Sequence, residues 1–225
     1  MKDNAVILFT RIPVEGKTKT RLKPLLTDEK CCRVQRAFIR DVYAMLQKDC
    51  NDCDIYVCFS PEGNLDELME ITPGAKSHFP QNGGDLGEKM FNALSRVLGK
   101  GYKRCLLIGS DIPQIKAAQL REAMDLLDSN DIVICPTIDG GYYLIAMKEP
   151  HKELFSIKEY GTSNVFEQTI EAAEKIKKKC ACGSKLMDID DQEDLFRLAE
   201  LLKEESAEVC VETRKILGEI LAGRV

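Results

Sequence analysis

Residues Cys105–Pro113 read Cys-Leu-Leu-Ile-Gly-Ser-Asp-Ile-Pro, and this stretch decides the fold class. Four consecutive apolar residues without polar alternation are typical of a strand that is buried on both faces of a sheet. The run ends in a glycine, a serine and Asp111, so a carboxylate is expected just beyond the carboxyl end of that strand. In open α/β sheets, ligands bind at this end of the strands.

Three other short runs have the same continuous apolar character, namely Ala5–Phe9, Ile55–Phe59 and Ile132–Cys135. Between and after these runs, apolar residues recur at helical spacing. The helical stripes are Val34, Phe38, Val42 and Met45; Met90, Leu94, Val97 and Leu98; Leu120, Met124 and Leu127; Val165, Thr169, Ala173 and Ile176; and Leu195, Leu198 and Leu202. Buried strands alternating with amphipathic helices predict an α/β fold with helices on both faces of a mostly parallel sheet.

The chain length suits either one large domain or a domain with an appendage, since domains average roughly 150 residues. No linker composition interrupts residues 1–203, which we expect to form a single domain. Residues 204–225 read as a separate charged amphipathic helix with Val209, Ile216 and Ile220 on its apolar side. This helix packs either on the body of the chain or on a partner, so a homo-oligomer remains an alternative.

Composition excludes several functions. The chain carries 32 Lys and Arg against 37 Asp and Glu, a net charge of −5, which disfavours nucleic acid and anionic membranes as main partners. No run approaches the roughly 20 apolar residues of a membrane span. No signal-peptide pattern is present either, so we expect a cytoplasmic protein with reduced cysteines.

Among the ten cysteines, two pairs have spacings that resemble those of metal ligands. Cys50 and Cys53 form a C-x-x-C pair, and Cys180 and Cys182 form a C-x-C pair. Together they offer four thiolates to a tetrahedral zinc. The second spacing is unusual for zinc, and other cysteines lie inside apolar runs, where a thiol packs as a small hydrophobe. Packing is therefore the expected role of all ten.

The segment after the first apolar run is strongly cationic. It contains five basic residues and one acidic residue, namely Arg11, Lys17, Lys19, Arg21 and Lys23 against Glu15. Arginine forks and lysine ammonium groups at the end of a strand suit a polyphosphate, and Gly16 permits close approach of the backbone. The alternative is a solvated basic turn. A P-loop is rejected, because Arg11 stands where its first glycine belongs and Pro13 removes an N–H.

A second polar segment, Gln81–Met90, precedes one of the helical stripes. Gly83 and Gly84 expose backbone groups near a helix N-terminus, which favours polar or anionic ligand atoms. Gln81 and Asp85 are candidates to contact the edge of a base. The spacing is not G-x-G-x-x-G, so a nicotinamide cofactor is unsupported.

Two carboxylates follow the third and fourth strands. Asp111 is placed to hold a hard divalent cation together with substrate phosphate oxygens, or alternatively to cap the helix after Pro113. Asp139 gives a second carboxylate in the stretch Pro136–Tyr143, where two glycines leave room for a substrate.

The order of these motifs resembles the nucleotide-diphospho-sugar transferase superfamily, which has the glycosyltransferase-A fold. It is most similar to a bacterial glycosyltransferase-A-like family linked to arsenosugar biosynthesis, whose relatives include phospholactate guanylyltransferases. The resemblance covers nearly all of the chain up to about Leu202 and implies a three-layer α/β/α sandwich with a mostly parallel mixed sheet. The motifs that carry it are Arg11–Gly16, Lys19–Leu22, Gln81–Glu88, Gly109–Pro113, Asp139–Tyr143 and Asp188–Asp190.

The resemblance also implies roles for residues. The nucleotide would bind in the N-terminal half, through Arg11, Gly16, Lys17, Lys19, Arg21, Gln81, Gly83, Gly84 and Asp85. The acceptor would bind in the C-terminal half, through Asp139, Gly140, Gly141, Tyr142, Thr162 and Ser163. Lys19 and Asp111 would be catalytic, and Asp111 would ligate Mg²⁺ or Mn²⁺. Asp139 or Asp190 is a candidate second ligand, although Asp190 or Asp191 also reads as the N-cap of the helix that follows.

Three functions stay open at this point. The resemblance favours a metal-dependent glycosyltransferase that moves a sugar from a nucleotide sugar to a small-molecule acceptor, whereas the long cationic loop with Lys19 suits nucleotidyl transfer. The first alternative is a guanylyltransferase-like nucleotidyltransferase that releases pyrophosphate from an NTP. The second alternative is a nucleotide-binding module without catalysis, since the strand before Asp111 supplies one carboxylate instead of a D-x-D pair.

Overall fold

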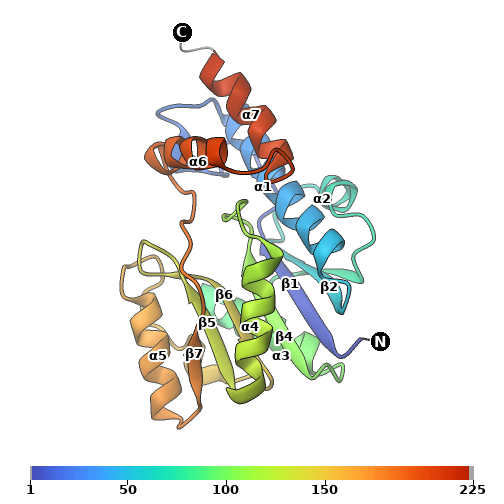
Figure 1. Cartoon of the computed structure of the whole chain (residues 1–225), viewed down its shortest axis with the longest axis vertical. Coiled ribbons are helices and arrows are strands. Elements are labelled where there is room, and N and C mark those ends of the chain that lie inside the picture. Colours follow the sequence, from blue (N-terminus) through green and yellow to red (C-terminus); the bar gives the residue numbers. More distant parts are fainter. Residues whose placement is uncertain (1, 223–225) are drawn as a thin grey trace.

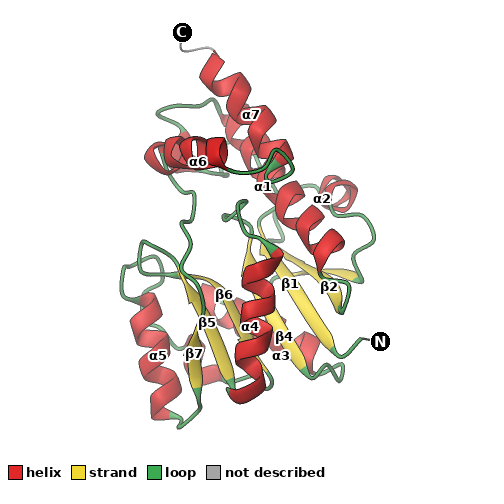
Figure 2. Ribbon diagram, viewed as in Figure 1, coloured by secondary structure: helices red, strands yellow, loops and turns green. Residues whose placement is uncertain are grey.

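The computed structural model describes residues 2–222 and shows a seven-stranded sheet between two layers of helices (Figures 1 and 2). Met1 of the predicted domain and residues 223–225 of the predicted C-terminal helix therefore lie outside the described residues. The strands are β1 (Asn4–Thr10), β2 (Cys53–Phe59), β3 (Ser77–Pro80), β4 (Arg104–Gly109), β5 (Ile132–Pro136), β6 (Tyr142–Met147) and β7 (Cys180–Cys182). The α-helices are α1 (Asp28–Asp49), α2 (Leu65–Ile71), α3 (Leu86–Leu98), α4 (Ala117–Ser129), α5 (Val165–Lys175), α6 (Gln192–Glu204) and α7 (Val211–Ala222). Two 3₁₀ helices, η1 (Thr20–Leu22) and η2 (Lys152–Phe155), complete the set of described helices.

The strand order is β3-β2-β1-β4-β6-β5-β7. In the part of the chain that the structure describes, β6 is the one antiparallel strand, because it pairs antiparallel with both β4 and β5 while every other pairing is parallel. The predicted mostly parallel mixed sheet is confirmed. As a consequence, the carboxyl ends of β1, β4, β5 and β7 meet at one edge of the sheet.

Helices cover both faces of the sheet, as the sequence predicts (Figure 1). Adjacent residues of β1 belong to opposite cores: Leu8 packs in the core shared with α1, α2 and α4, and Ile7 in the core shared with α3 and α5. Both side chains are fully buried. The alternation of side chains along a strand thus produces the three-layer sandwich.

Three strands and one α-helix were not predicted from the sequence, namely β3, β6, β7 and α2, and neither were the two 3₁₀ helices. The strands β3 and β7 contain four and three residues and lie at the two edges of the sheet. Their short, partly polar sequences give almost no periodic signal.

A third core lies beyond the end of the sheet, where α6 and α7 pack on the first half of α1 (Figure 1). Its buried residues include Phe38 of α1, Leu198 of α6 and Ile216 of α7. The C-terminal helix begins at Val211, later than the predicted start at residue 204, and packs on its own chain. Whether residues 1–203 form a domain without it stays a prediction.

A carboxylate in the middle of α1 holds the start of α7. Asp41 is 9% exposed, and its two oxygens accept hydrogen bonds from the backbone N–H groups of Glu212 (3.0 Å) and Thr213 (2.8 Å). Burial raises the pKa of Asp41, while these hydrogen bonds act in the opposite direction. The first N–H groups of a helix have no partner within the helix, so Asp41 serves as a cap supplied from another helix.

Asp41→Ala is expected to lower the free energy of unfolding by about 1–2 kcal/mol, because one buried and one partly buried N–H group at the start of α7 lose their acceptor. Urea denaturation followed by circular dichroism measures the change. Asp49→Ala, which removes an exposed carboxylate from the last residue of the same helix, should stay within about 0.5 kcal/mol of the parent. Equal losses in the two variants would show that the bonds to α7 contribute nothing.

The ten cysteines are all free, and eight of them are buried. Cys53 begins β2 and Cys180 begins β7, and four strands separate β2 from β7 in the sheet. The two cysteine pairs therefore cannot bind one zinc ion, and packing accounts for the buried thiols. None of the helices within residues 2–222 is both long enough and apolar enough to cross a membrane.

Candidate functional site

A cleft of about 760 Å³ opens at the edge of the sheet where the four carboxyl ends meet. Its volume is within the range of small-molecule sites, roughly 300–1,000 Å³. The walls come from the segments after β1, β4, β5 and β7 and from the start of α3. The predicted site residues that line it are Arg11, Lys17, Lys19, Arg21, Gln81, Asp111, Asp139, Gly141, Tyr142, Thr162 and Asp190.

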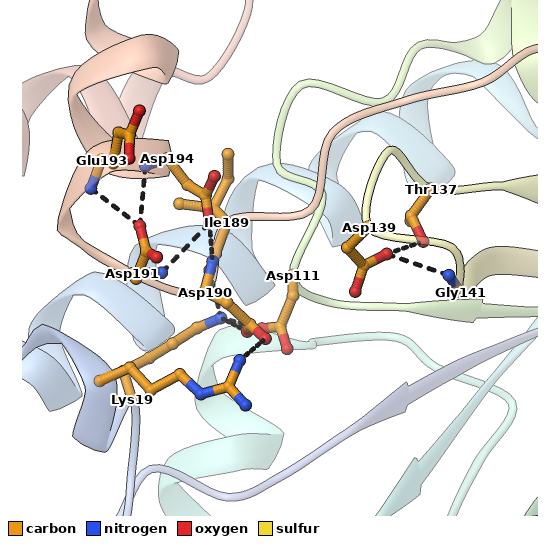
Figure 3. Close-up of polar contacts among 11 residues, drawn as sticks. Lys19, Asp111, Thr137, Asp139, Gly141, Ile189, Asp190, Asp191, Glu193 and Asp194 are labelled. Carbon is orange, nitrogen blue, oxygen red and sulfur yellow. Dashed lines mark hydrogen bonds and ion pairs between the residues drawn. The ribbon is translucent and has the colours of Figure 1, made fainter. Parts of the chain in front are cut away.

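Lys19 lies beside Asp111 and Asp190 in this site (Figure 3). Its Nζ lies 2.8 Å from Oδ1 of Asp111 and 3.4 Å from Oδ1 of Asp190, and it donates a 2.6 Å hydrogen bond to the carbonyl of Ile189. The Lys19 side chain is only 5% exposed, and its ammonium group lies 5.5 Å from the centre of the Phe38 ring. One ammonium therefore joins the segments after β1, β4 and β7.

The backbone of Lys19 is in the left-handed region, with φ 46° and ψ 45°. A non-glycine residue rarely adopts this conformation, and such strain is typical of functional sites. The loop is fixed on both sides of Lys19, because the Thr18 hydroxyl accepts a 2.7 Å hydrogen bond from the Val14 N–H and Leu22 is fully buried. The scaffold thus holds the Lys19 side chain in the cleft.

The other cations of the loop differ in whether they form ion pairs. Arg21 is largely exposed and pairs with Asp190 at 3.3 Å, and Lys17 pairs with Glu62 at 3.2 Å on the surface. Within residues 2–222, Arg11 has no ion pair, so its guanidinium is available to an anionic ligand. The sequence predicts a cationic loop correctly, but most of its charge is already paired.

Lys89 also lines the cleft and has no ion pair in the described part of the chain. It is not among the site residues predicted from the sequence. It is the fourth residue of α3, where the helix dipole disfavours a cation. A basic residue at that unfavourable position, after a Gly-Gly turn, is the signal that could have identified it.

Two further carboxylates face the cleft from the opposite wall. Oδ1 of Asp139 accepts hydrogen bonds from the Thr137 hydroxyl (2.5 Å) and the Gly141 N–H (3.0 Å), which fixes the side chain (Figure 3). Burial, together with the charges of Asp139 and Asp190, raises the pKa of Asp188 to about 6. From the sequence, Asp188 is identified only as the first residue of the motif Asp188–Asp190. The smaller contributions from Asp139 and Asp190 to the raised pKa show that neighbouring carboxylates add negative charge around Asp188.

The structure separates ligand candidates from helix caps. Asp191 is the N-cap of α6, because its Oδ1 accepts hydrogen bonds from the N–H groups of Glu193 (2.8 Å) and Asp194 (3.1 Å). The Asp190 carboxylate instead faces Lys19 (Figure 3). Asp111 caps no helix, since α4 starts at Ala117 after Lys116.

Six predicted site residues do not line the cleft, namely Gly16, Gly83, Gly84, Asp85, Gly140 and Ser163. Asp85 instead caps α3 by accepting a 2.8 Å hydrogen bond from the Glu88 N–H. The Gly84 N–H is bonded to the Glu88 carboxylate at 2.9 Å, so it is not free for a ligand. Gly140 packs tightly against the backbone of Ser163. These residues shape the turns around the cleft, which a glycine-rich sequence alone cannot distinguish from ligand contact.

A buried network of polar side chains lies at the ends of β1 and β4 and supports the site. The Ser110 hydroxyl accepts hydrogen bonds from the Thr10 hydroxyl (2.8 Å) and from the Gln35 amide (2.9 Å), and so links β1, β4 and α1. The Gln81 amide donates to the Thr10 carbonyl at 3.0 Å. The network fixes the backbone immediately before Asp111, and the sequence analysis did not identify Thr10, Ser110 or Gln35.

The fold and the cleft together define a class. The chain has the α/β fold of nucleotide-diphospho-sugar transferases: a crystal structure from Desulfovibrio desulfuricans G20, described as such a transferase, superimposes with a TM-score of 0.89 at 28% identity, over 99% of this chain and 96% of that one. A cytidylyltransferase from Leptospira borgpetersenii shares the fold with a TM-score of 0.59 at 14% identity, over 99% and 96% of the two chains.

The particular family is also clear. The chain belongs to the family described as "Uncharacterized protein conserved in bacteria (DUF2064)", whose profile matches residues 44–162, more than half of the chain. A curated relative, the 2-phospho-L-lactate guanylyltransferase of Methanobrevibacter smithii, is 26% identical over 143 residues. That match covers 63% of this chain, and the chain spans 62% of the length of the curated relative.

Proposed function

We propose that this protein is a nucleotidyltransferase, which transfers a nucleoside monophosphate from an NTP to a small-molecule acceptor and releases pyrophosphate. The observation that carries the proposal is the convergence of Lys19, Asp111 and Asp190 at the carboxyl edge of the sheet. The guanylyltransferase relative favours this reaction over the glycosyl transfer that the sequence analysis preferred.

The N-terminal wall of the cleft suits a triphosphate. Arg11 and Lys89 lack ion pairs among residues 2–222, and Lys19 and Arg21 are held nearby by carboxylates. Phosphate oxygens bind arginine forks and lysine ammonium groups through short charge-assisted hydrogen bonds. The start of α3 borders the same wall and adds the positive end of a helix dipole.

Asp111 and Asp190 fit a divalent metal ion. Both present an oxygen to the same Lys19 ammonium, so the two carboxylates already converge on one cation. Within residues 2–222, no three Asp, Glu, His or Cys side chains are grouped as a complete metal site. Mg²⁺ commonly takes one or two carboxylates plus substrate phosphates and water. When bound, such an ion would neutralise charge on the triphosphate and on the leaving pyrophosphate.

In this proposal the chain's own residues position the reaction. An acceptor oxygen attacks the α-phosphorus, and the bond from that phosphorus to the pyrophosphate oxygen breaks. Lys19 moves its hydrogen bonds from the carboxylates to the α-phosphate, where charge increases in the transition state. The rigid loop around Lys19 limits that movement to its side chain, so little reorganisation is required.

Calorimetric titration with each NTP and with NDP-sugars, with and without Mg²⁺ or Mn²⁺, tests the proposal together with assays for released pyrophosphate and NDP. We expect metal-dependent NTP binding and pyrophosphate release. Arg11→Ala should weaken NTP binding about tenfold, the loss of one charge-assisted hydrogen bond, whereas exposed Lys100→Ala should not. Binding of NDP-sugars alone with NDP release would establish glycosyl transfer instead. The absence of any metal-dependent nucleotide binding would favour the non-catalytic module.

A further inference from the structure

We infer that the acceptor is a neutral polyhydroxylated molecule that attacks through a hydroxyl group, not a phosphate ester or another anion. This inference rests on the proposed nucleotidyl transfer and names the second substrate of the same cleft. It differs from what the name of the guanylyltransferase relative states for that protein, whose acceptor is a phosphate ester.

The cations and most of the carboxylates of the cleft come from different parts of the chain, which form its N-terminal wall and its C-terminal wall and meet where Asp190 pairs with Lys19. Among residues 2–222, every cation that lines the cleft comes from the first 89 positions, namely Arg11, Lys17, Lys19, Arg21 and Lys89. The described lining residues between positions 137 and 222 include the carboxylates Asp139, Asp188 and Asp190 and contain no lysine, arginine or histidine. Lys158 and Lys185 belong to this half of the chain, but both are exposed and neither lines the cleft.

An anionic acceptor would meet these carboxylates without a compensating cation on its own wall. Like charges at short distance repel strongly in a partly desolvated cleft. Asp190 is already paired with Lys19 and Arg21, but Asp139 and Asp188 have no ion pair in the described part of the chain. A phosphate ester at this wall would therefore be repelled by the residues that must position it.

The same wall offers what a polyol needs. Asp139 is fixed through Oδ1 by Thr137 and Gly141, and its Oδ2 has no protein partner within residues 2–222, so it can accept hydrogen bonds from ligand hydroxyls. The ring of Tyr142 lies beside Met90, its hydroxyl 3.8 Å from the thioether sulfur. Tyr160 is held by a 3.2 Å hydrogen bond to the Phe155 carbonyl. Both tyrosines line the cleft, where rigid rings suit the apolar face of a sugar or alditol.

With a hydroxyl group as nucleophile, every bond and proton of the transfer is accounted for. The acceptor oxygen forms a bond to the α-phosphorus, the bond to pyrophosphate breaks, pyrophosphate leaves, and the hydroxyl proton is released to solvent. The product is a phosphodiester between the acceptor and the nucleoside. Attack by a phosphate ester would give a diphosphate instead, so the two products differ in covalent structure.

Matched acceptor pairs test the inference: glycerol with glycerol 3-phosphate, erythritol with erythritol 4-phosphate, and glucose with glucose 6-phosphate. Each is supplied with the NTP that the protein binds, and ³¹P NMR identifies the product by the presence or absence of phosphorus–phosphorus coupling. We expect kcat/KM to be at least tenfold higher for the neutral members, with an uncoupled phosphodiester product. Preference for the phosphate esters, or a coupled diphosphate product, would overturn the inference.

Two variants distinguish residues that bind the acceptor from residues that bind the NTP. Asp139→Asn should raise KM for the neutral acceptor about tenfold and leave the Kd of the NTP unchanged, while exposed Asp125→Asn should change neither. Lys89→Met should weaken NTP binding and leave the acceptor KM unchanged; a rise in acceptor KM alone would mean that Lys89 holds an acceptor anion.

A binding measurement keeps the inference testable without turnover. With a non-hydrolysable NTP analogue bound, each neutral acceptor should raise the Tm of the protein more than its phosphate ester raises it. The inference fails if no neutral acceptor raises Tm more than the matching phosphate ester. Failure of the proposed function has a different signature, namely no pyrophosphate release and no metal-dependent NTP binding.

Discussion

Asp111→Asn is expected to lower the kcat of nucleotidyl transfer roughly 100–1,000-fold, the usual effect of removing one electrostatic group from the reacting centre. The variant should also remove the dependence of NTP affinity on Mg²⁺. Asp111 presents Oδ1 to Lys19 at 2.8 Å, and its carboxylate is the one placed directly beyond the end of β4. An asparagine keeps the shape of the side chain but is a poor ligand for a hard cation. Steady-state kinetics and calorimetry with and without Mg²⁺ measure both effects.

The fold of this variant should remain intact, because the hydrogen bond from the Ile189 N–H at 2.9 Å is accepted by the backbone carbonyl of Asp111 and not by its side chain. Asp125→Asn, on the exposed side of α4, is the matched control and should retain full activity. An unchanged Mg²⁺ dependence in Asp111→Asn would remove Asp111 from the proposed metal site.

Gly140→Ala is expected to lower the free energy of unfolding by about 3 kcal/mol. Gly140 has φ +93°, and a Cβ there would lie 1.9 Å from the Ser163 carbonyl oxygen. The left-handed backbone costs roughly 1 kcal/mol for alanine, and forced overpacking adds about 1–3 kcal/mol. The Gly140 carbonyl also accepts a 2.9 Å hydrogen bond from the Phe166 N–H at the start of α5, so relief of the clash would disturb that contact. Urea denaturation measures the loss.

Gly161→Ala is the control for backbone strain alone. Gly161 has φ +84°, but nothing lies within 4 Å of the position that its Cβ would take. This variant should lose only about 1 kcal/mol. Similar losses at the two positions would show that the contact between Gly140 and Ser163 contributes nothing to stability.

The predictable part of the fold is the part with a strong periodic signal. The runs Ala5–Phe9 and Cys105–Ile108 become β1 and β4, which lie side by side in the interior of the sheet and are buried on both faces. β6 is also apolar, yet its place between β4 and β5 and its reversed direction depend on pairings with strands distant in sequence. Local patterns carry no information on such pairings.

The candidate site likewise has a part that the sequence predicts and a part that it does not. The sequence can place Asp111 beyond a strand and a cationic loop beyond another, because those relations are local. It cannot show that Lys19 meets Asp190, since 171 positions separate them and the contact depends on how β7 leads into α6. Nor can it choose between Asp190 and Asp191 as the helix cap, because both precede α6 and both have a side chain suited to capping.

In the proposed function, the position of Lys19 has a consequence for how a metal ion and a nucleotide would bind. Its ammonium is attached to the chain and lies between two carboxylates, so it competes with any free divalent ion at a high effective concentration. Nucleotide phosphates give that ammonium another partner, and the carboxylates then become available. Metal and nucleotide should therefore bind with positive cooperativity, each raising the affinity for the other. The protein without nucleotide should retain almost no metal during purification, and chelators should leave its Tm unchanged.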